Sequence, residues 1–203
     1  LQDVTEKVKA TDRLHFLAEH DPLTGILNRR GIEKEFDEAV AMLGDGVSMS
    51  LAYLDLDRFK LINDLFGHLA GDEVLKQVCE RVRNMLTEGQ SMGRVGGDEF
   101  VIVFKGTPID SAAWVCRGIV DRIGNLPYQI GDRAFQVKGS IGLMEISESI
   151  RVKDAISVAD RACREAKSGN HGNPVIYDRH SPVFREREDE LRLIARFGTN
   201  VAP

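Results

Sequence analysis

The chain has 203 residues, of which 42% are hydrophobic and 29% charged, and its formal net charge is -5. This composition excludes a fibrous or largely disordered protein, and the length suits one well-buried domain with extensions. The acidic balance argues against nucleic acid as the main partner, because a phosphate backbone is bound through a basic face.

The cysteines and the lack of long apolar runs indicate where in the cell the protein is located. Cys79, Cys116 and Cys163 are scattered at apolar positions of predicted helices, a pattern typical of reduced thiols in a cytoplasmic protein. No apolar run approaches the length of a membrane span and no signal peptide is present, so we expect no membrane contact by this piece. Since it begins at Leu1 without Met, we expect it to come from a longer protein that could be membrane-anchored.

The first predicted elements are two helices. Residues 1–20 predict a helix that either packs on its own domain or links it to a preceding one, with a sparse apolar stripe of Val4, Val8, Leu14 and Leu17. Asp21-Pro22 ends this helix. A second helix is predicted over residues 31–43, and its apolar residues, at helical spacing, should face a sheet: Ile32, Phe36, Val40 and Leu43.

An apolar strand over residues 50–54 then runs into Asp55-Leu56-Asp57, and a strand period of two puts both aspartates on one face. A short helix over 59–65 carries Lys60 and Asn63. Asp72 follows near the start of a strongly amphipathic helix.

Residues 93–100 predict a tight hairpin, with Gly96-Gly97 taking positive φ angles and Asp98 and Glu99 leaving the turn. Taken alone, this could be an ordinary hairpin with solvated acids. Beside Asp55 and Asp57, the two acids predict a carboxylate cluster that a divalent cation would stabilise. Oxygen ligands without nearby His or Cys favour Mg²⁺ or Mn²⁺ over Zn²⁺.

The remaining elements complete an α+β pattern. We expect a helix over 108–123 with Trp114 as a packing residue, strands over 128–130 and 135–146, a helix over 153–167 and an edge strand over 174–177. A charged tail helix follows from residue 181. Because helices alternate with hairpins, the pattern favours an α+β layer over a wholly parallel sheet.

Several motifs, in order, resemble the GGDEF domains, most of whose active members are diguanylate cyclases. They are Asp21-Pro22-Leu23-Thr24-Gly25 with Asn28-Arg29-Arg30, Asp55 to Asp64, Phe66-Gly67-His68 with Gly71-Asp72, Arg94 to Phe100, Ser140-Ile141-Gly142 and Ala159-Asp160. The resemblance implies a palm-like fold, with a mixed, mostly antiparallel sheet flanked by helices. It also implies a linker helix over 1–20, a GGDEF domain over 21–178 and a connector helix over 179–203, with an N-terminal PAS-like sensor and a C-terminal EAL phosphodiesterase domain in the full-length chain.

The resemblance also implies roles for individual residues. The metal ligands would be Asp55, the Leu56 carbonyl, Asp98 and Glu99, and the last two acids would be catalytic. Asn63 and Asp72 would bind guanine, while Lys60 and Lys167 would meet the triphosphate. From the residues alone, Asp72 could equally be a helix N-terminal acid and Lys60 a surface lysine. Arg94 should brace the hairpin or the carboxylates.

Two departures from the family pattern stand out. Thr87 and Gln90 occupy the positions of the Arg and Asp of the family's inhibitory product site, so we expect that site to be absent. The family's phosphate-binding Arg after the last helix has no clear equivalent among residues 168–173, where Asn170 and His171 stand instead.

These observations favour a diguanylate cyclase that joins two GTP into cyclic di-GMP with Mg²⁺ and acts as a homodimer, because the product has twofold symmetry. The alternative is a GTP-binding module, catalytically weak, that regulates an adjoining phosphodiesterase. A structural dimerisation unit without ligand would leave the clustered acids unexplained.

Overall fold

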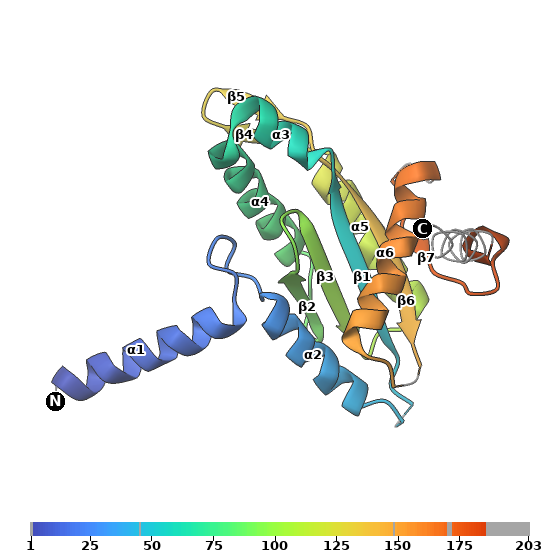
Figure 1. The fold of residues 1–203 in the computed structure, drawn as a ribbon, viewed down its shortest axis with the longest axis horizontal. Helices are drawn as coiled ribbons and strands as arrows, with labels where there is room; N and C mark the ends of the chain where they lie inside the picture. The colour runs from blue at the N-terminus through green and yellow to red at the C-terminus, as the bar shows by residue number, and fades with distance from the viewer. Residues whose placement is uncertain (1, 45, 148, 170–171, 186–203) are drawn as a thin grey trace, which may run out of the picture.

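A computed structural model describes residues 2–44, 46–147, 149–169 and 172–185 (Figure 1). The helices are α1 (Gln2–Glu19), α2 (Arg29–Ala41), α3 (Phe59–Phe66), α4 (His68–Arg83), α5 (Ile109–Gly124) and α6 (Val152–Gly169). The strands are β1 (Met49–Asp57), β2 (Gln90–Arg94), β3 (Glu99–Lys105), β4 (Tyr128–Ile130), β5 (Arg133–Phe135), β6 (Lys138–Ile146) and β7 (Val175–Ile176).

The described residues form a five-stranded sheet in the order β2-β3-β1-β6-β7, with β4 and β5 as a separate hairpin. β1 pairs antiparallel with β3 on one side and with β6 on the other, and only the short β7 runs parallel to its neighbour. In this register Asp55 lies opposite Glu99 on β3 and opposite Ser140 on β6. The predicted mixed, mostly antiparallel sheet flanked by helices is confirmed.

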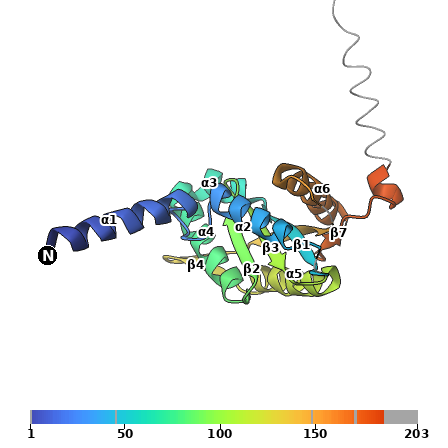
Figure 2. The ribbon, with the colours of Figure 1, turned by 90° about the horizontal axis from the view of Figure 1, so that it is seen from below.

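Helices cover both faces of the sheet (Figure 2). The apolar even-numbered residues of β1, such as Leu54, belong to the core under α4 and α5, whereas Leu51 and Tyr53 belong to the core under α2 and α6. Since side chains alternate along a strand, Asp55 and Asp57 lie on the same face as Tyr53. The prediction that both aspartates share a face is confirmed.

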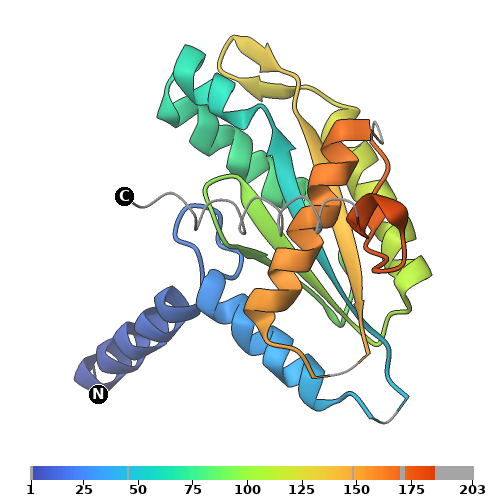
Figure 3. The same ribbon diagram turned by 45° about the vertical axis from the view of Figure 1, so that its right-hand side comes forward.

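Helix α6 crosses the sheet in close contact with β6 (Figure 3). A side chain at Gly142 would collide with the backbone of α6 at Ala159 and Cys163, so this contact requires glycine. The Cys163 thiol also donates to the Ser140 carbonyl at 3.1 Å. These contacts fix the distance between α6 and the sheet, and therefore the position of the Lys167 backbone.

Helix α1 projects away from the sheet (Figures 1 and 2). Its predicted apolar stripe is not buried, since Val4 is 68% exposed and Leu14 is 69% exposed. The alternative of a helix packed on its own domain is therefore wrong for most of its length. None of the helices in the described part of the chain has the length and apolar character needed to span a membrane.

Two local predictions are wrong. Trp114 is 79% exposed, because Ala112, Cys116 and Ile119 form the buried face of α5 and Trp114 lies on the opposite face. Neither Gly96 nor Gly97 has a φ angle in the left-handed region.

The predicted connector helix over 179–203 falls mostly outside the described residues. At its start, Phe184 is buried against Tyr177.

Candidate functional site

The turn between β2 and β3 is held by Arg94. Its guanidinium donates to the carbonyls of Gly96 and Gly97, at 3.1 Å and 2.8 Å, and pairs with Asp21 at 3.2 Å. Arg94 therefore braces the hairpin, as predicted, and ties it to the loop between α1 and α2. A forked donor suits this task, because its five N–H groups reach several acceptors at once.

Gly96 leaves space for a neighbouring side chain and does not have a φ angle in the left-handed region. A β-carbon there would collide with the carboxylate of Glu99, which lies folded against the turn. The backbone N–H groups of Val95 and Gly96 both donate to the Glu99 carbonyl, at 3.0 Å and 3.3 Å. The turn thus holds the backbone of Glu99 and leaves room for its side chain.

Three carboxylates converge where β1 meets this hairpin. Glu99 is the β3 residue opposite Asp55, and the Leu56 N–H donates to the Asp98 carbonyl at 3.3 Å. Burial raises the pKa of Asp98 above its usual value, and nearby Glu99 adds to this rise. Burial also raises the pKa of Asp55, with Asp98 and Glu99 contributing, although Lys167 acts in the opposite direction. Asp98 and Glu99 therefore lie close enough to Asp55 to act on its ionisation.

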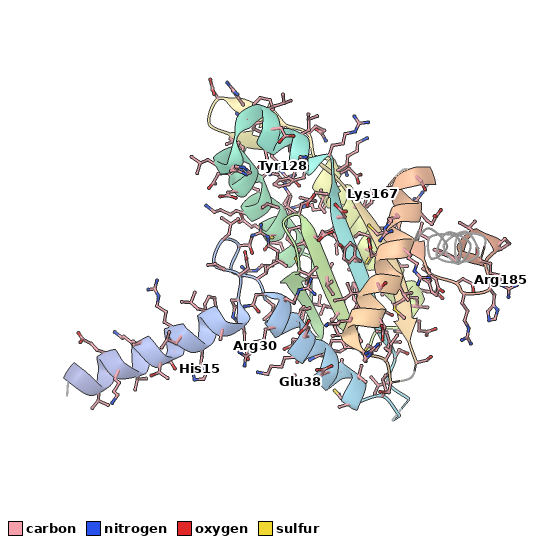
Figure 4. The ribbon with its side chains drawn as sticks, in the orientation of Figure 1. His15, Arg30, Glu38, Tyr128, Lys167 and Arg185 are labelled. Carbon is pink, nitrogen blue, oxygen red and sulfur yellow. The ribbon has the colours of Figure 1, made fainter. Side chains whose placement is uncertain are left out.

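Lys167 supplies a positive charge to this cluster from the last turn of α6 (Figure 4). Its Nζ lies 2.8 Å from Asp55 Oδ2 and 3.8 Å from Asp57 Oδ1. Burial lowers the pKa of Lys167, but the hydrogen bond and charge of Asp55 outweigh that effect, so the pKa is raised. Lys167 therefore remains charged at neutral pH.

The acids have the chemistry of a hard-cation site, since carboxylate and carbonyl oxygens are the ligands that Mg²⁺ prefers. Within the part of the chain that the structure describes, however, no group of three or more His, Cys, Asp or Glu side chains is arranged to hold a metal ion. The ammonium of Lys167 contacts Oδ2 of Asp55, one of the oxygens that could bind a cation. The donor set thus fits a divalent cation, provided that Lys167 moves off Asp55.

The predicted guanine-binding residues form a second group on α3 and α4. The side chain of Asn63 lies directly against Gly71, where any β-carbon would collide with its oxygen, and Asp72 follows Gly71 on α4. Lys60 is exposed near the start of α3. The structure therefore brings Asn63 next to the start of α4, while the contact of Lys60 with phosphate stays a prediction.

A cleft of about 870 Å³ opens beside Lys167, and the acid in its lining is Asp57. Its polar end is formed by Asp57, Arg58, Lys138 and Lys167, and its apolar wall comes mainly from α3 and the β4–β5 hairpin. Arg58, at the junction of β1 and α3, has a φ of 56° and is the one described non-glycine residue with positive φ. Asn170 and His171, which the sequence places near Lys167, lie outside the described residues.

Sequence reasoning gave no role to two residues that the structure places in the site. Burial raises the pKa of the Tyr53 hydroxyl, and the carboxylate of Glu99 adds to this rise. Ser140 Oγ donates to both oxygens of Asp57, at 2.9 Å and 3.1 Å. Tyr53 could have been found from the strand period, because it lies two residues before Asp55, but nothing in the sequence pairs Ser140 with Asp57.

Comparison with known proteins agrees with the resemblance. A family model described as "Diguanylate cyclase, GGDEF domain" matches residues 18–173. The chain is 31% identical over 180 residues to the probable diguanylate cyclase DgcE of Escherichia coli, a match that covers 88% of this chain and 16% of that protein. It is 34% identical over 186 residues to the cyclic di-GMP phosphodiesterase PdeR of the same organism, covering 91% of this chain and 27% of that protein.

Solved structures give the same result. The diguanylate cyclase SiaD of Pseudomonas aeruginosa, in complex with its activator SiaC, has a TM-score of 0.74 at 30% identity. The match covers 87% of this chain and 69% of the SiaD chain. The coiled coil and GGDEF domain of DgcB from Caulobacter crescentus, in complex with c-di-GMP, has a TM-score of 0.79 at 23% identity, covering 87% and 94%, which supports the fold. The chain spans only 16% and 27% of the lengths of DgcE and PdeR. Since the family model matches most of its length, the chain belongs to the GGDEF domain family.

Proposed function

We propose that this domain is a diguanylate cyclase, which joins two GTP molecules into cyclic di-GMP and releases pyrophosphate. The observation that carries the proposal is the convergence of Asp55, Asp98 and Glu99 at one end of β1, with Lys167 on Asp55. Such a cluster serves little purpose in a fold, because its acids repel one another, but it suits phosphoryl transfer.

In each of the two condensation steps, a sugar hydroxyl of one GTP attacks the α-phosphorus of the other, and the bond to pyrophosphate breaks. Asp55, Asp98, Glu99 and the Leu56 carbonyl would hold Mg²⁺ or Mn²⁺, which supplies positive charge to the phosphates. Glu99 would accept the hydroxyl proton, since the turn holds its backbone and its carboxylate lies near Tyr53. Asp98, beside it, would share in this proton transfer as the second catalytic acid.

Recognition of GTP is assigned to residues of α3, α4 and α6. Asp72 would accept from the ring N–H and amine of guanine, and Asn63 can both donate and accept. Lys167, at the cleft, and exposed Lys60 would contact the triphosphate. The cleft volume lies within the range of nucleotide-sized ligand sites.

Two domains facing each other across a symmetric product make a homodimer the economical assembly. The projecting helix α1 would link a preceding sensor to this domain and set that encounter. PdeR is named as a phosphodiesterase, which supports a longer protein in which an EAL domain follows. The three buried free thiols, Cys79, Cys116 and Cys163, are consistent with a cytoplasmic location.

The direct test is product analysis after incubation of the 203-residue protein with GTP and Mg²⁺. We expect cyclic di-GMP from the unmodified protein and a loss of about a hundredfold or more for Asp98→Ala and Glu99→Ala, with the fold intact by circular dichroism. Asp132→Ala, which removes an exposed acid from the β4–β5 turn, is the control. GTP binding without product would favour the regulatory module, and near-normal turnover by both variants would refute the proposed site.

A further inference from the structure

Lys167 lies between two carboxylates that are not equivalent. Its Nζ is in hydrogen-bonding contact with Asp55 at 2.8 Å, whereas Asp57 is 3.8 Å away. Both acids point to the same face of β1, two residues apart, so a small change in the lysine torsions carries the ammonium from one to the other. Lys167 thus has a second acceptor within reach.

Ser140 holds the Asp57 carboxylate in an orientation in which it can accept the Lys167 ammonium. This serine is 7% exposed, and its hydroxyl donates to both oxygens of Asp57. An ionised carboxylate has about four acceptor positions, so one hydroxyl leaves several for an ammonium. The Ser140 bond therefore orients Asp57 without using up its capacity to accept.

The backbone of Lys167 cannot move away easily. Gly142 allows α6 to sit directly on β6, and the Cys163 thiol donates to the Ser140 carbonyl. The same residue, Ser140, therefore anchors α6 through its carbonyl and orients Asp57 through its hydroxyl. Only the side chain of Lys167 is free to respond to a change at Asp55.

A divalent cation and an ammonium cannot share Asp55 Oδ2, because like charges a few ångströms apart repel strongly in a partly buried site. If Lys167 had to leave into solvent, cation binding would lose its ion pair without replacement. Asp57 offers that replacement on the rim of the cleft that both residues line.

We infer that Asp57, oriented by Ser140, is a positioning residue that receives Lys167 when a divalent cation binds Asp55. The exchange keeps the ammonium at the mouth of the cleft, where it can meet an anionic substrate. This inference rests on the proposed function for its metal ion, and it adds a role for two residues that contact neither metal nor substrate in the scheme above.

The test is a double-mutant cycle on Mn²⁺ affinity, measured without nucleotide by electron paramagnetic resonance on the 203-residue protein. We expect Lys167→Met to tighten Mn²⁺ binding about tenfold, because the competing ammonium is gone. Asp57→Asn should weaken binding about tenfold when Lys167 is present, but at most about threefold in the Lys167→Met background, where only the lost charge matters.

Ser140→Ala is the matched variant that changes no charge. We expect it to weaken Mn²⁺ binding two- to threefold when Lys167 is present and to have no effect in the Lys167→Met background. Equal effects of Asp57→Asn in both backgrounds would overturn the inference, since Asp57 would then be a metal ligand or a purely structural residue. In that case the proposed function stands, whereas an unmodified protein that binds no Mn²⁺ would refute both.

Discussion

Tyr53 on β1 lies diagonally across the ladder from Glu99 on β3, because Asp55, two residues after Tyr53, is the partner of Glu99. Burial, with Glu99 next, raises the pKa of Tyr53 above its usual value, so the hydroxyl remains a donor at neutral pH. Tyr53→Phe removes the hydrogen bond that this hydroxyl can make to the Glu99 carboxylate and leaves Glu99 free to rotate. We expect turnover to fall about tenfold, as for the loss of such a bond.

The measurement is kcat with GTP at saturation, because the bond positions a catalytic group and does not bind substrate. Tyr177→Phe, directly after the edge strand β7, is the control for a generic Tyr to Phe change. An unchanged kcat for Tyr53→Phe would mean that the turn alone orients Glu99.

Asp98→Asn should stabilise the metal-free protein at neutral pH. The pKa of Asp98 is raised in the folded state, mainly by burial. The folded chain therefore holds more protons than the unfolded chain above the ordinary value of 3.8, and stability falls as the pH rises from there through the raised pKa. The substitution removes this penalty.

We expect Tm to rise by about 2–4 °C at pH 7, which corresponds to about 1 kcal/mol for a chain of this size, and by less near pH 4. Thermal unfolding in EDTA at the two pH values measures this, with Asp132→Asn as the exposed control. A gain of the same size at both pH values would contradict the electrostatic cause.

Arg81→Met should destabilise the fold without touching the site. The Arg81 guanidinium donates to the carbonyls of Ile123, Leu126 and Pro127, at 3.4, 2.7 and 2.8 Å, and stacks 3.6 Å from the centre of the Tyr128 ring. We expect a loss of about 2 kcal/mol, because several partly exposed hydrogen bonds to one charged group disappear together.

Urea unfolding monitored by fluorescence measures this change. Arg83→Met, two residues further along α4 and exposed, is the matched control and should lie within about 0.5 kcal/mol of the unmodified protein. A similar loss of stability for both variants would show that the loss comes from the removed helix charge, and not from the Arg81 hydrogen bonds to the α5–β4 connection.

Product inhibition through the surface before the turn should be weak. The Gln90 side chain accepts from the Thr87 N–H at 3.1 Å, so its amide oxygen is used within the turn over residues 87–90. Neither Thr87 nor Gln90 carries a positive charge that could bind a phosphate. We expect turnover to be insensitive to micromolar cyclic di-GMP. Strong inhibition that is lost in Thr87→Ala or Gln90→Ala would contradict this.

Much of the fold could be predicted from periodicity, because the buried faces of β1, α4 and α5 are strongly apolar. Asp55 and Asp57 were placed on one face by the strand period alone. What the sequence could not supply is contact across elements: the position of Lys167 on Asp55 depends on the depth at which α6 sits over Gly142. The prediction that Trp114 packs in the core is wrong for a different reason, since hydrophobic character alone does not say which side of α5 a residue occupies.

β1 is hydrogen-bonded along both edges, to β3 and to β6, and it carries Asp55 and Asp57 at its end. A strand paired on both sides opens only when the whole domain unfolds, so its amides should exchange with deuterium at the slowest rate in the chain. The repulsion that Asp98 and Glu99 exert on Asp55 therefore cannot relax by local fraying of β1. This repulsion lowers the stability of the entire domain, and any cation that relieves it should slow exchange along the full length of β1.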